Sequence, residues 1–116
     1  MTFIVLDRDG VINEDSDDYI KAADEWIPIE GSLEAIATLT ASGYRVAIAT
    51  NQSGLARGLF DEYALANIHQ KLCASVEDEG GFIEGIFFCP HGPDESCSCR
   101  KPGTGLLTRI EQELGV

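Results

Sequence analysis

The stretch FIVLDRDGVIN, Phe3 to Asn13, decides the fold of this chain. Its first four residues are apolar, and they lead directly into two aspartates, Asp7 and Asp9, and then into Gly10. A short apolar run bounded by a turn residue is typical of a fully buried strand in a parallel sheet. We therefore predict a strand over the four apolar residues, and this strand delivers two carboxylates to its carboxyl end.

Helices and strands alternate along the rest of the chain. Apolar residues at helical spacing follow the candidate N-caps Ser32 and Asp61, and Gly43 is the expected stop of the first helix. The order predicts a single three-layer α/β domain, Rossmann-like, with a parallel sheet. In such sheets ligands bind at the carboxyl ends of the strands, which here carry Asp-Arg-Asp, Thr-Asn and Cys-Pro-His. The predicted helices cover residues 33–41, 62–79 and 104–114, and the further strands cover 45–50 and 83–88.

The composition narrows the choice of partners and location. The 116 residues carry a net charge of −12, which argues against nucleic acid or an anionic membrane surface as the main partner. The sequence has no apolar run typical of a signal peptide or a membrane span. We therefore expect a soluble, cytoplasmic protein whose partner is a small molecule.

The two aspartates form the first candidate catalytic group. Two carboxylates this close repel each other unless a cation lies between them or one of them holds a proton, so they suit a nucleophile, a metal site or a proton donor. The alternative is that one acid caps a turn and the other is solvated. The motif DRDGVIN resembles the signature DxDG[TV] of the haloacid dehalogenase superfamily of phosphotransferases. That resemblance implies that Asp7 attacks phosphorus, and that Asp9 protonates the leaving oxygen and later activates water.

Two further motifs continue the resemblance. Thr50 stands where the second motif of the superfamily supplies a hydroxyl to the phosphoryl group, and Lys101 in CRKP stands where the third motif supplies a lysine. Cations stabilise the charge that spreads over a transferring phosphoryl group. Half of the eight lysines and arginines lie in the three site segments: Arg8, Arg57, Arg100 and Lys101.

These cations do not all carry the same expectation. Arg100 is expected to bind a second substrate anion in the bidentate manner of a guanidinium group. A surface salt bridge is the alternative for Arg57 and Arg100. The alternation of side chains along a strand favours an orientation of Arg8 away from the pocket.

The combination of DRDG, TNQSGLARG and CRKP is more specific. It resembles the heptose 1,7-bisphosphate 7-phosphatases of the histidinol-phosphatase-related branch, which lack a separate cap domain. The resemblance implies Mg²⁺-dependent removal of the 7-phosphate in the supply of heptose precursors for lipopolysaccharide; histidinol-phosphate phosphatase is the alternative activity. It also implies that Asn51 binds the substrate, and that Tyr19 and Lys21 lie in a covering loop over residues 11–30.

A cysteine cluster predicts a second metal site. Cys89, His91, Cys97 and Cys99 offer one imidazole and three thiolates within a loop over residues 89–101, which suits a closed tetrahedral Zn²⁺ site. The alternatives are four unrelated residues or a disulfide between Cys97 and Cys99. The same loop is similar to the zinc loop of the heptose bisphosphatases. Cys73 is interpreted as a small buried residue, and His69 as a helix-surface histidine without a role.

One motif of the superfamily has no counterpart in the 116 residues. That fourth motif is a strand ending in Gly-Asp with further acids that complete the Mg²⁺ site, so the resemblance covers the first two thirds of such a domain. Mg²⁺ would then be held by the Asp7 carboxylate and, by resemblance, by the Asp9 backbone carbonyl, with weakened binding and little turnover. The strand over residues 3–6 would become an exposed edge that favours self-association.

A rival hypothesis from another class stays open. It is a catalytically impaired binding fragment, stapled by zinc, that takes up phosphorylated metabolites or a partner chain. A two-component receiver domain does not fit, because its phosphorylated aspartate ends the third strand and not the first.

Overall fold

The computed structural model describes residues 3–16, 19–52, 54–90 and 105–114. The described elements alternate as the sequence predicts, with one short 3₁₀ turn, η1, added before the first helix. In chain order they are β1 (Phe3–Leu6), η1 (Ala23–Glu25), α1 (Ser32–Ala41), β2 (Arg45–Asn51), α2 (Glu62–Asp78), β3 (Gly85–Cys89) and α3 (Gly105–Leu114).

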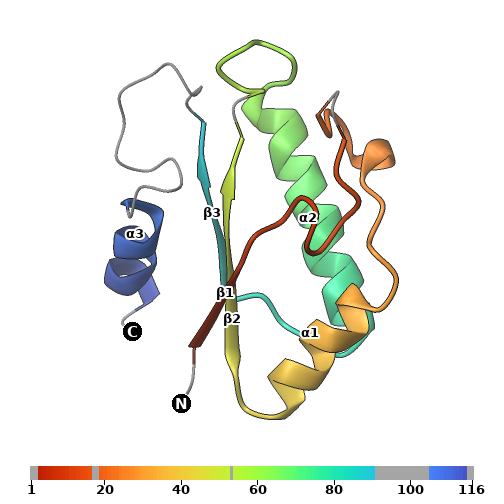
Figure 1. The fold of residues 1–116 in the computed structure, drawn as a ribbon, viewed down its shortest axis with the longest axis vertical. Coiled ribbons are helices and arrows are strands. Elements are labelled where there is room, and N and C mark those ends of the chain that lie inside the picture. Colours follow the sequence, from red (N-terminus) through yellow and green to blue (C-terminus); the bar gives the residue numbers. More distant parts are fainter. Residues whose placement is uncertain (1–2, 17–18, 53, 91–104, 115–116) are drawn as a thin grey trace.

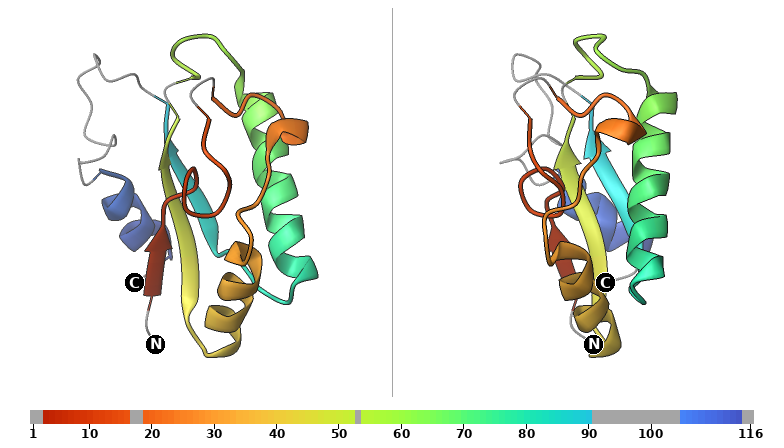
Figure 2. Two further views of the ribbon diagram at one scale, coloured as in Figure 1. Left: turned by 45° about the vertical axis from the view of Figure 1, so that its right-hand side comes forward. Right: turned by 90° about the vertical axis from the view of Figure 1, so that its right-hand side faces the viewer.

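The described strands form one parallel sheet in the order β1-β2-β3. All three strands run upward in Figure 1; β2 and β3 end at the top of the sheet, and β1 ends lower, beside β2. Helices α1 and α2 cover one face and α3 covers the other, as the turned views of Figure 2 also show. The predicted three-layer α/β fold with a parallel sheet is confirmed.

Strand β2 fills the centre of this arrangement, because both of its faces are buried. Val46 and Ile48 pack into the core under α1 and α2, whereas the alternating residues Ala47 and Ala49 pack into the core under α3. Two covered faces explain the nearly continuous apolar sequence of β2. The small side chains of Ala47 and Ala49 lie opposite Leu106 and Ile110 in that second core.

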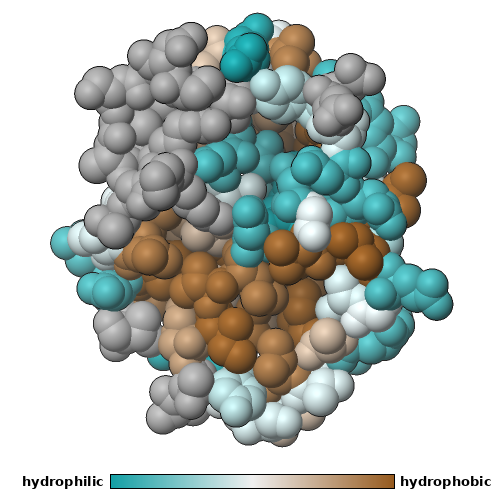
Figure 3. All heavy atoms as spheres, viewed as in Figure 1, coloured by the Kyte–Doolittle hydropathy of each residue, from teal (hydrophilic) through white to brown (hydrophobic). Residues whose placement is uncertain are grey.

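Strand β1 differs from its prediction. It pairs with β2 on one side, and in the described part of the chain it is an edge strand. Its residues are mostly half-buried and Val5 is 37% exposed, so the prediction of a fully buried strand is wrong. Figure 3 shows hydrophobic residues gathered in the lower half of the face that β1 and α3 share.

The first helix begins differently from its prediction. The N-cap position belongs to Gly31, in the left-handed conformation with φ of 87°, and Ser32 is the first helical residue. The Ser32 hydroxyl donates to the Ile12 carbonyl oxygen at 2.7 Å, so it ties α1 to the segment after β1 and does not cap the helix. Gly43, with φ of 91°, follows the end of the helix as predicted.

Helix α2 matches its prediction closely. The Asp61 carboxylate accepts a hydrogen bond from the Ala64 backbone N–H at 2.8 Å, which caps the helix. The buried side of α2 consists of Leu65, Ile68, Leu72 and Val76. Strand β3 runs from Gly85 to Cys89, so it begins two residues later than predicted.

No helix among the described residues is both long and apolar enough to cross a membrane.

The segment between β1 and α1 is folded back along α2. Asn13 forms backbone bridges with Asp9 and with Pro28, and Trp26 is 1% exposed. The Lys71 ammonium of α2 donates to the carbonyl oxygens of Ala23 and Trp26 at 2.7 and 3.0 Å. The segment is therefore anchored to the helix, next to the carboxyl end of β1 (Figure 1).

Candidate active site

The parallel register brings the ends of β1 and β2 together. Leu6 lies opposite Ile48, so Asp7 follows β1 beside the last residues of β2. Asp7 is exposed, and its Oδ1 accepts from the Arg8 backbone N–H at 2.8 Å. Thr50 is 1% exposed, near the end of β2. Asp7 and Thr50, two of the predicted catalytic residues, therefore lie at the same edge of the sheet.

The Asp9 carboxylate accepts hydrogen bonds from three side chains at this edge. Its Oδ1 accepts from Arg8 Nε at 2.8 Å and from Asn13 Nδ2 at 3.0 Å, and its Oδ2 accepts from Gln52 Nε2 at 3.3 Å. Asn13 is fully buried and also donates to the Glu14 carbonyl oxygen. The carboxylate is therefore held from three directions by donors.

Gln52 connects two of the predicted catalytic residues. Besides the contact with Asp9, its Nε2 donates to Thr50 Oγ1 at 3.0 Å, and the residue is only 3% exposed. The two hydrogens of one amide group thus serve β1 and β2 at once. Sequence reasoning missed Gln52; the signal was its position directly after the predicted pair Thr50 and Asn51 at a strand end.

Arg8 is a buried cation. It is 0% exposed, and its Nη2 lies 2.8 Å from Asp9 Oδ1 in an ion pair without the geometry of a hydrogen bond. Its Nη1 lies 3.1 Å from His69 Nε2. The expected orientation away from the pocket agrees with this burial. The Asp9 carboxylate therefore compensates the charge of the buried Arg8 side chain.

His69 is part of this network and is half-buried, so its interpretation as a helix-surface histidine is wrong. It lies on α2, and its ring centroid is 6.2 Å from that of Phe88 on β3. Burial, and secondly the nearby Arg8 cation, lower the pKa of His69 from its usual 6.5 to about 4, against an opposing effect of Asp9. The spacing of Leu65, His69, Leu72 and Val76, in steps of four and three, was the available signal.

The structure describes four of the predicted substrate-binding residues. Asn51 is half-buried at the end of β2, opposite Cys89, and Arg57 is exposed in the following loop. Tyr19 is half-buried and has a positive φ of 66°. Lys21 Nζ lies 3.5 Å from Glu25 Oε1 in the segment before α1. The other predicted site residues lie outside the described residues: His91, Cys97, Cys99, Arg100 and Lys101.

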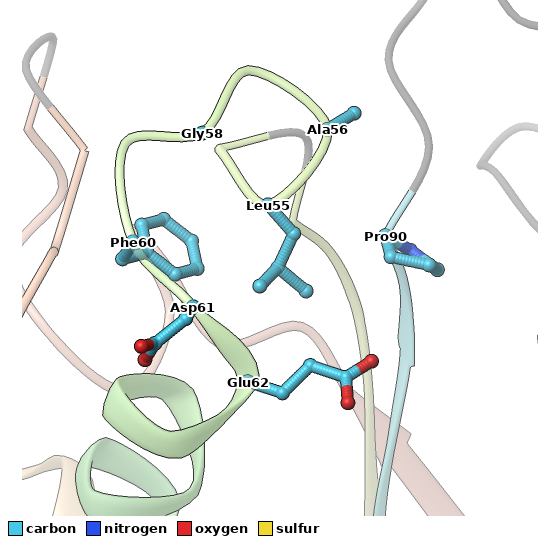
Figure 4. A pocket seen from close by; sticks show the side chains of 7 residues that line it. All are labelled: Leu55, Ala56, Gly58, Phe60, Asp61, Glu62 and Pro90. Carbon is cyan, nitrogen blue, oxygen red and sulfur yellow. The ribbon is translucent and has the colours of Figure 1, made fainter.

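An open pocket of about 740 Å³ lies between the loop after β2 and the end of β3. Figure 4 shows Leu55 and Glu62 extending into the space that faces Pro90. Asp7, Asp9 and Thr50 do not line this pocket in the described part of the chain. The hydrogen-bonded group around Asp9, and not this open pocket, therefore defines the candidate site.

The donor set at this edge fits a hard cation. Mg²⁺ prefers oxygen ligands and is commonly held by one or two carboxylates while it keeps several waters, and the Asp7 carboxylate is exposed at the strand end. No group of three or more His, Cys, Asp or Glu side chains suited to a metal occurs among the described residues. Of the four predicted zinc ligands the structure describes only Cys89, which is buried at the end of β3.

Comparison with known proteins agrees with the fold and identifies the family. The family model for polynucleotide kinase 3 phosphatase matches residues 2–115. The D-glycero-beta-D-manno-heptose-1,7-bisphosphate 7-phosphatase of Pseudomonas aeruginosa is 55% identical over 115 residues, which cover 99% of this chain and 65% of the relative. The enzyme of the same name from Bordetella bronchiseptica is 53% identical over 116 residues, which cover 100% and 65%.

A solved structure extends this likeness to three dimensions. The D,D-heptose 1,7-bisphosphate phosphatase of B. bronchiseptica, crystallised with magnesium and phosphate, superimposes with a TM-score of 0.95 at 52% identity. The match covers 100% of this chain and 65% of that one. The chain thus spans about two thirds of the length of the relatives that it matches.

Proposed function

The chain belongs to the polynucleotide kinase 3 phosphatase family of haloacid dehalogenase-like proteins, and from this membership we propose that it carries catalytic residues of a sugar-phosphate phosphatase. The proposed reaction is Mg²⁺-dependent removal of the 7-phosphate from D-glycero-D-manno-heptose 1,7-bisphosphate. The relatives that are 53–55% identical are D-glycero-beta-D-manno-heptose-1,7-bisphosphate 7-phosphatases, which supports this substrate.

The first chemical step belongs to Asp7. A carboxylate oxygen of Asp7 attacks phosphorus and forms a new P–O bond, while the bond from phosphorus to the sugar oxygen breaks. In the substrate complex Asp9 carries a proton, and the leaving oxygen takes this proton as the bond to phosphorus breaks. Asp7 is suited to this step because its carboxylate is exposed at the end of β1.

The second step returns the site to its starting state. Asp9, now a carboxylate, takes a proton from water, and the water oxygen bonds to phosphorus as the bond from Asp7 breaks. Inorganic phosphate leaves, and Asp9 is again protonated. One residue thus acts first as an acid and then as a base.

The remaining residues bind and orient the substrate. Thr50 and Asn51 hold oxygens of the transferred phosphoryl group, and Lys101 neutralises part of its charge. The residues proposed to bind the rest of the substrate are Tyr19, Lys21, Arg57 and Arg100. The Asp7 carboxylate and the Asp9 backbone carbonyl would hold Mg²⁺, which would supply positive charge to offset the negative charge of the phosphoryl group.

The single observation that carries the proposal is the bridge from Asp9 through Gln52 to Thr50. Its two hydrogen bonds, 3.3 and 3.0 Å long, join the acid of the first motif to the hydroxyl of the second. A turn cap and a solvated carboxylate, the alternative for the two aspartates, would not require a buried amide between β1 and β2.

Phosphate release is the direct test. The protein in its natural full length is assayed with Mg²⁺ on both anomers of the heptose bisphosphate and on histidinol phosphate. We expect turnover of a heptose bisphosphate, and its loss in Asp7→Asn. Loading of Asp7 by beryllium fluoride, followed by ¹⁹F NMR, tests the nucleophile without turnover. Preference for histidinol phosphate would contradict the assigned substrate, and absence of both loading and turnover would favour a binding module.

Zinc is a separate proposal. We assign the ligands Cys89, His91, Cys97 and Cys99, because a buried thiol at the end of β3 suits the first ligand of such a site. We expect one equivalent of zinc by elemental analysis, and its loss together with thermal stability in Cys89→Ser. A zinc-free protein of unchanged stability would contradict this. The cytoplasmic location also stays a prediction.

A further inference from the structure

The burial of Arg8 raises the question of what that residue does. An uncompensated charge inside a protein is very unfavourable, so a buried guanidinium group needs partners for its donors. Arg8 has two: Asp9 Oδ1, at 2.8 Å from both Nε and Nη2, and His69 Nε2, at 3.1 Å from Nη1. The group therefore links the acid of the first motif to helix α2.

The chemistry of this contact determines the state of His69. A guanidinium group has donors and no acceptor. His69 Nε2 must then present its lone pair to Arg8, with the proton of the imidazole on Nδ1. The lowered pKa of His69, about 4, agrees with a neutral ring at physiological pH.

His69 is attached to a rigid part of the molecule. The neighbouring residues Ile68 and Leu72 are fully buried in the core beneath α2, and the Phe88 ring of β3 lies beside the imidazole. The contact between Arg8 and His69 joins positions that are 61 residues apart in the chain. The turn after β1 is thus braced against the longest helix of the fold.

The two oxygens of Asp9 are held unequally. Oδ1 accepts short contacts from Arg8 and Asn13, whereas Oδ2 accepts one longer contact of 3.3 Å from Gln52, on the side of Thr50. Oδ1 is therefore the anchored oxygen. Oδ2 is the one with remaining capacity to carry a proton toward a substrate.

We propose that His69 is a positioning residue which, through Arg8, fixes the Asp9 carboxyl group so that Oδ2 faces the reacting phosphate ester. This inference rests on the proposed phosphatase function. It adds that the acid–base group is oriented through its Oδ1 atom, by way of Arg8, and that His69 itself does not contact the substrate.

The test compares three substitutions on α2. His69→Leu removes the acceptor, His69→Gln keeps an acceptor of similar reach, and Val76→Ala loosens the core two turns away, as a matched control for stability. In His69→Leu we expect kcat to fall about 10- to 100-fold, the size typical of a misplaced acid–base group, with KM changed less than about threefold. His69→Gln should recover most of the loss.

The affinity of Asp7 for beryllium fluoride distinguishes a positioning role of His69 from a general loss of structure. Beryllium fluoride binds the nucleophile and does not need a proton from Asp9, so its affinity should stay within about threefold in His69→Leu. If His69→Leu lowers kcat and the affinity for beryllium fluoride by the same factor, and Val76→Ala does the same, His69 has only a structural role. That result would overturn the proposal. Unchanged kcat in His69→Leu, or no recovery in His69→Gln, would overturn it as well.

A measurement without turnover keeps the test independent of the proposed function. Hydrogen exchange of the Arg8 Nε–H, followed by NMR, should be at least about tenfold faster in His69→Leu and unchanged in Val76→Ala. His69→Asn, whose shorter amide does not reach Nη1, replaces the leucine variant if that variant does not fold. If the unsubstituted protein neither loads nor turns over, the proposed function fails, and unchanged exchange would then also reject the link through Arg8.

Discussion

At the scale of single residues, the site depends on where a few donors point. Asp9 receives hydrogen bonds from Arg8, Asn13 and Gln52, and each of these donors is buried. Fixed donors of this kind orient a carboxyl group without rearrangement during the reaction. We therefore expect these buried donors to set the orientation of the proposed acid–base group.

Gln52 provides the first prediction at this scale. Gln52→Met keeps the volume of the side chain but removes the donor shared by Asp9 and Thr50. We expect kcat for phosphate release to fall about 10- to 100-fold, since both groups lose their relative orientation. The free energy of unfolding should fall by about 1 kcal/mol. Steady-state kinetics and urea unfolding check the two effects, and a kcat within threefold of the unsubstituted protein would contradict the bridge.

His69 provides a prediction on pH. Its pKa is about 4 in the folded protein and 6.5 as an ordinary histidine, so between these values the unfolded chain binds a proton that the folded chain does not. Stability is therefore lost as pH falls through this window, by at most about 3 kcal/mol. His69→Gln should remove this contribution.

Urea unfolding at several pH values between 7 and 4 measures the effect. The stability of the unsubstituted protein should fall more steeply on acidification than that of His69→Gln, while the dependence on urea concentration stays equal. Parallel losses in the two proteins would show that other groups carry the acid sensitivity.

At the scale of elements, the apolar patterns predict most of the strands and helices. Strands β1 and β2 and helix α2 lie where the sequence places them, because the strands are short continuous apolar runs and the apolar residues of α2 recur at helical spacing. The start of α1 was predicted less well. Ser32 has the side chain of an N-cap, but its hydroxyl bonds to Ile12, twenty residues away, and this partner depends on tertiary packing.

The segment before α1 yields a prediction about its attachment. Lys71 donates to two carbonyl oxygens of that segment and lies 5.8 Å from the centre of the Trp26 ring. Lys71→Met removes these contacts, so Trp26 should become more accessible to acrylamide and its emission should shift to longer wavelength. Trp26 is the one tryptophan of the sequence, which makes the signal specific.

A matched control lies in the same segment. Glu25→Gln breaks the exposed ion pair with Lys21, which contributes little to stability. It should leave the quenching of Trp26 unchanged. Equal quenching in Lys71→Met and the unsubstituted protein would show that the segment is held by other contacts.

At the scale of the whole molecule, the edge strand β1 offers a surface for contact with another chain. A groove of about 290 Å³ lies beside the edge of β1, lined by Phe3, Val5, Leu107, Ile110 and Glu111. An apolar edge strand with unpaired backbone groups favours pairing with another chain. The self-association predicted from the sequence therefore stays a prediction, now with a defined surface.

Light scattering of the 116-residue chain over a range of concentrations tests it. We expect the mean mass to rise with concentration. Val5→Lys places a charge on the exposed face of β1 and should shift the distribution toward the monomer, because a charged edge strand resists pairing. A monodisperse monomer at high concentration for the unsubstituted chain would contradict the prediction.

The sequence by itself determined the order of the elements, the parallel sheet, and the strand ends at which Asp7, Asp9 and Thr50 lie, because these follow from local periodicity and from the rule that parallel strands share one carboxyl edge. Only the tertiary structure decided that Arg8 is buried, that Gln52 joins Asp9 to Thr50, and that His69 is neutral. The physical reason is that the orientation and pKa of a side chain depend on its neighbours in space. For Gln52 and His69 those neighbours lie 43 and 61 residues away along the chain.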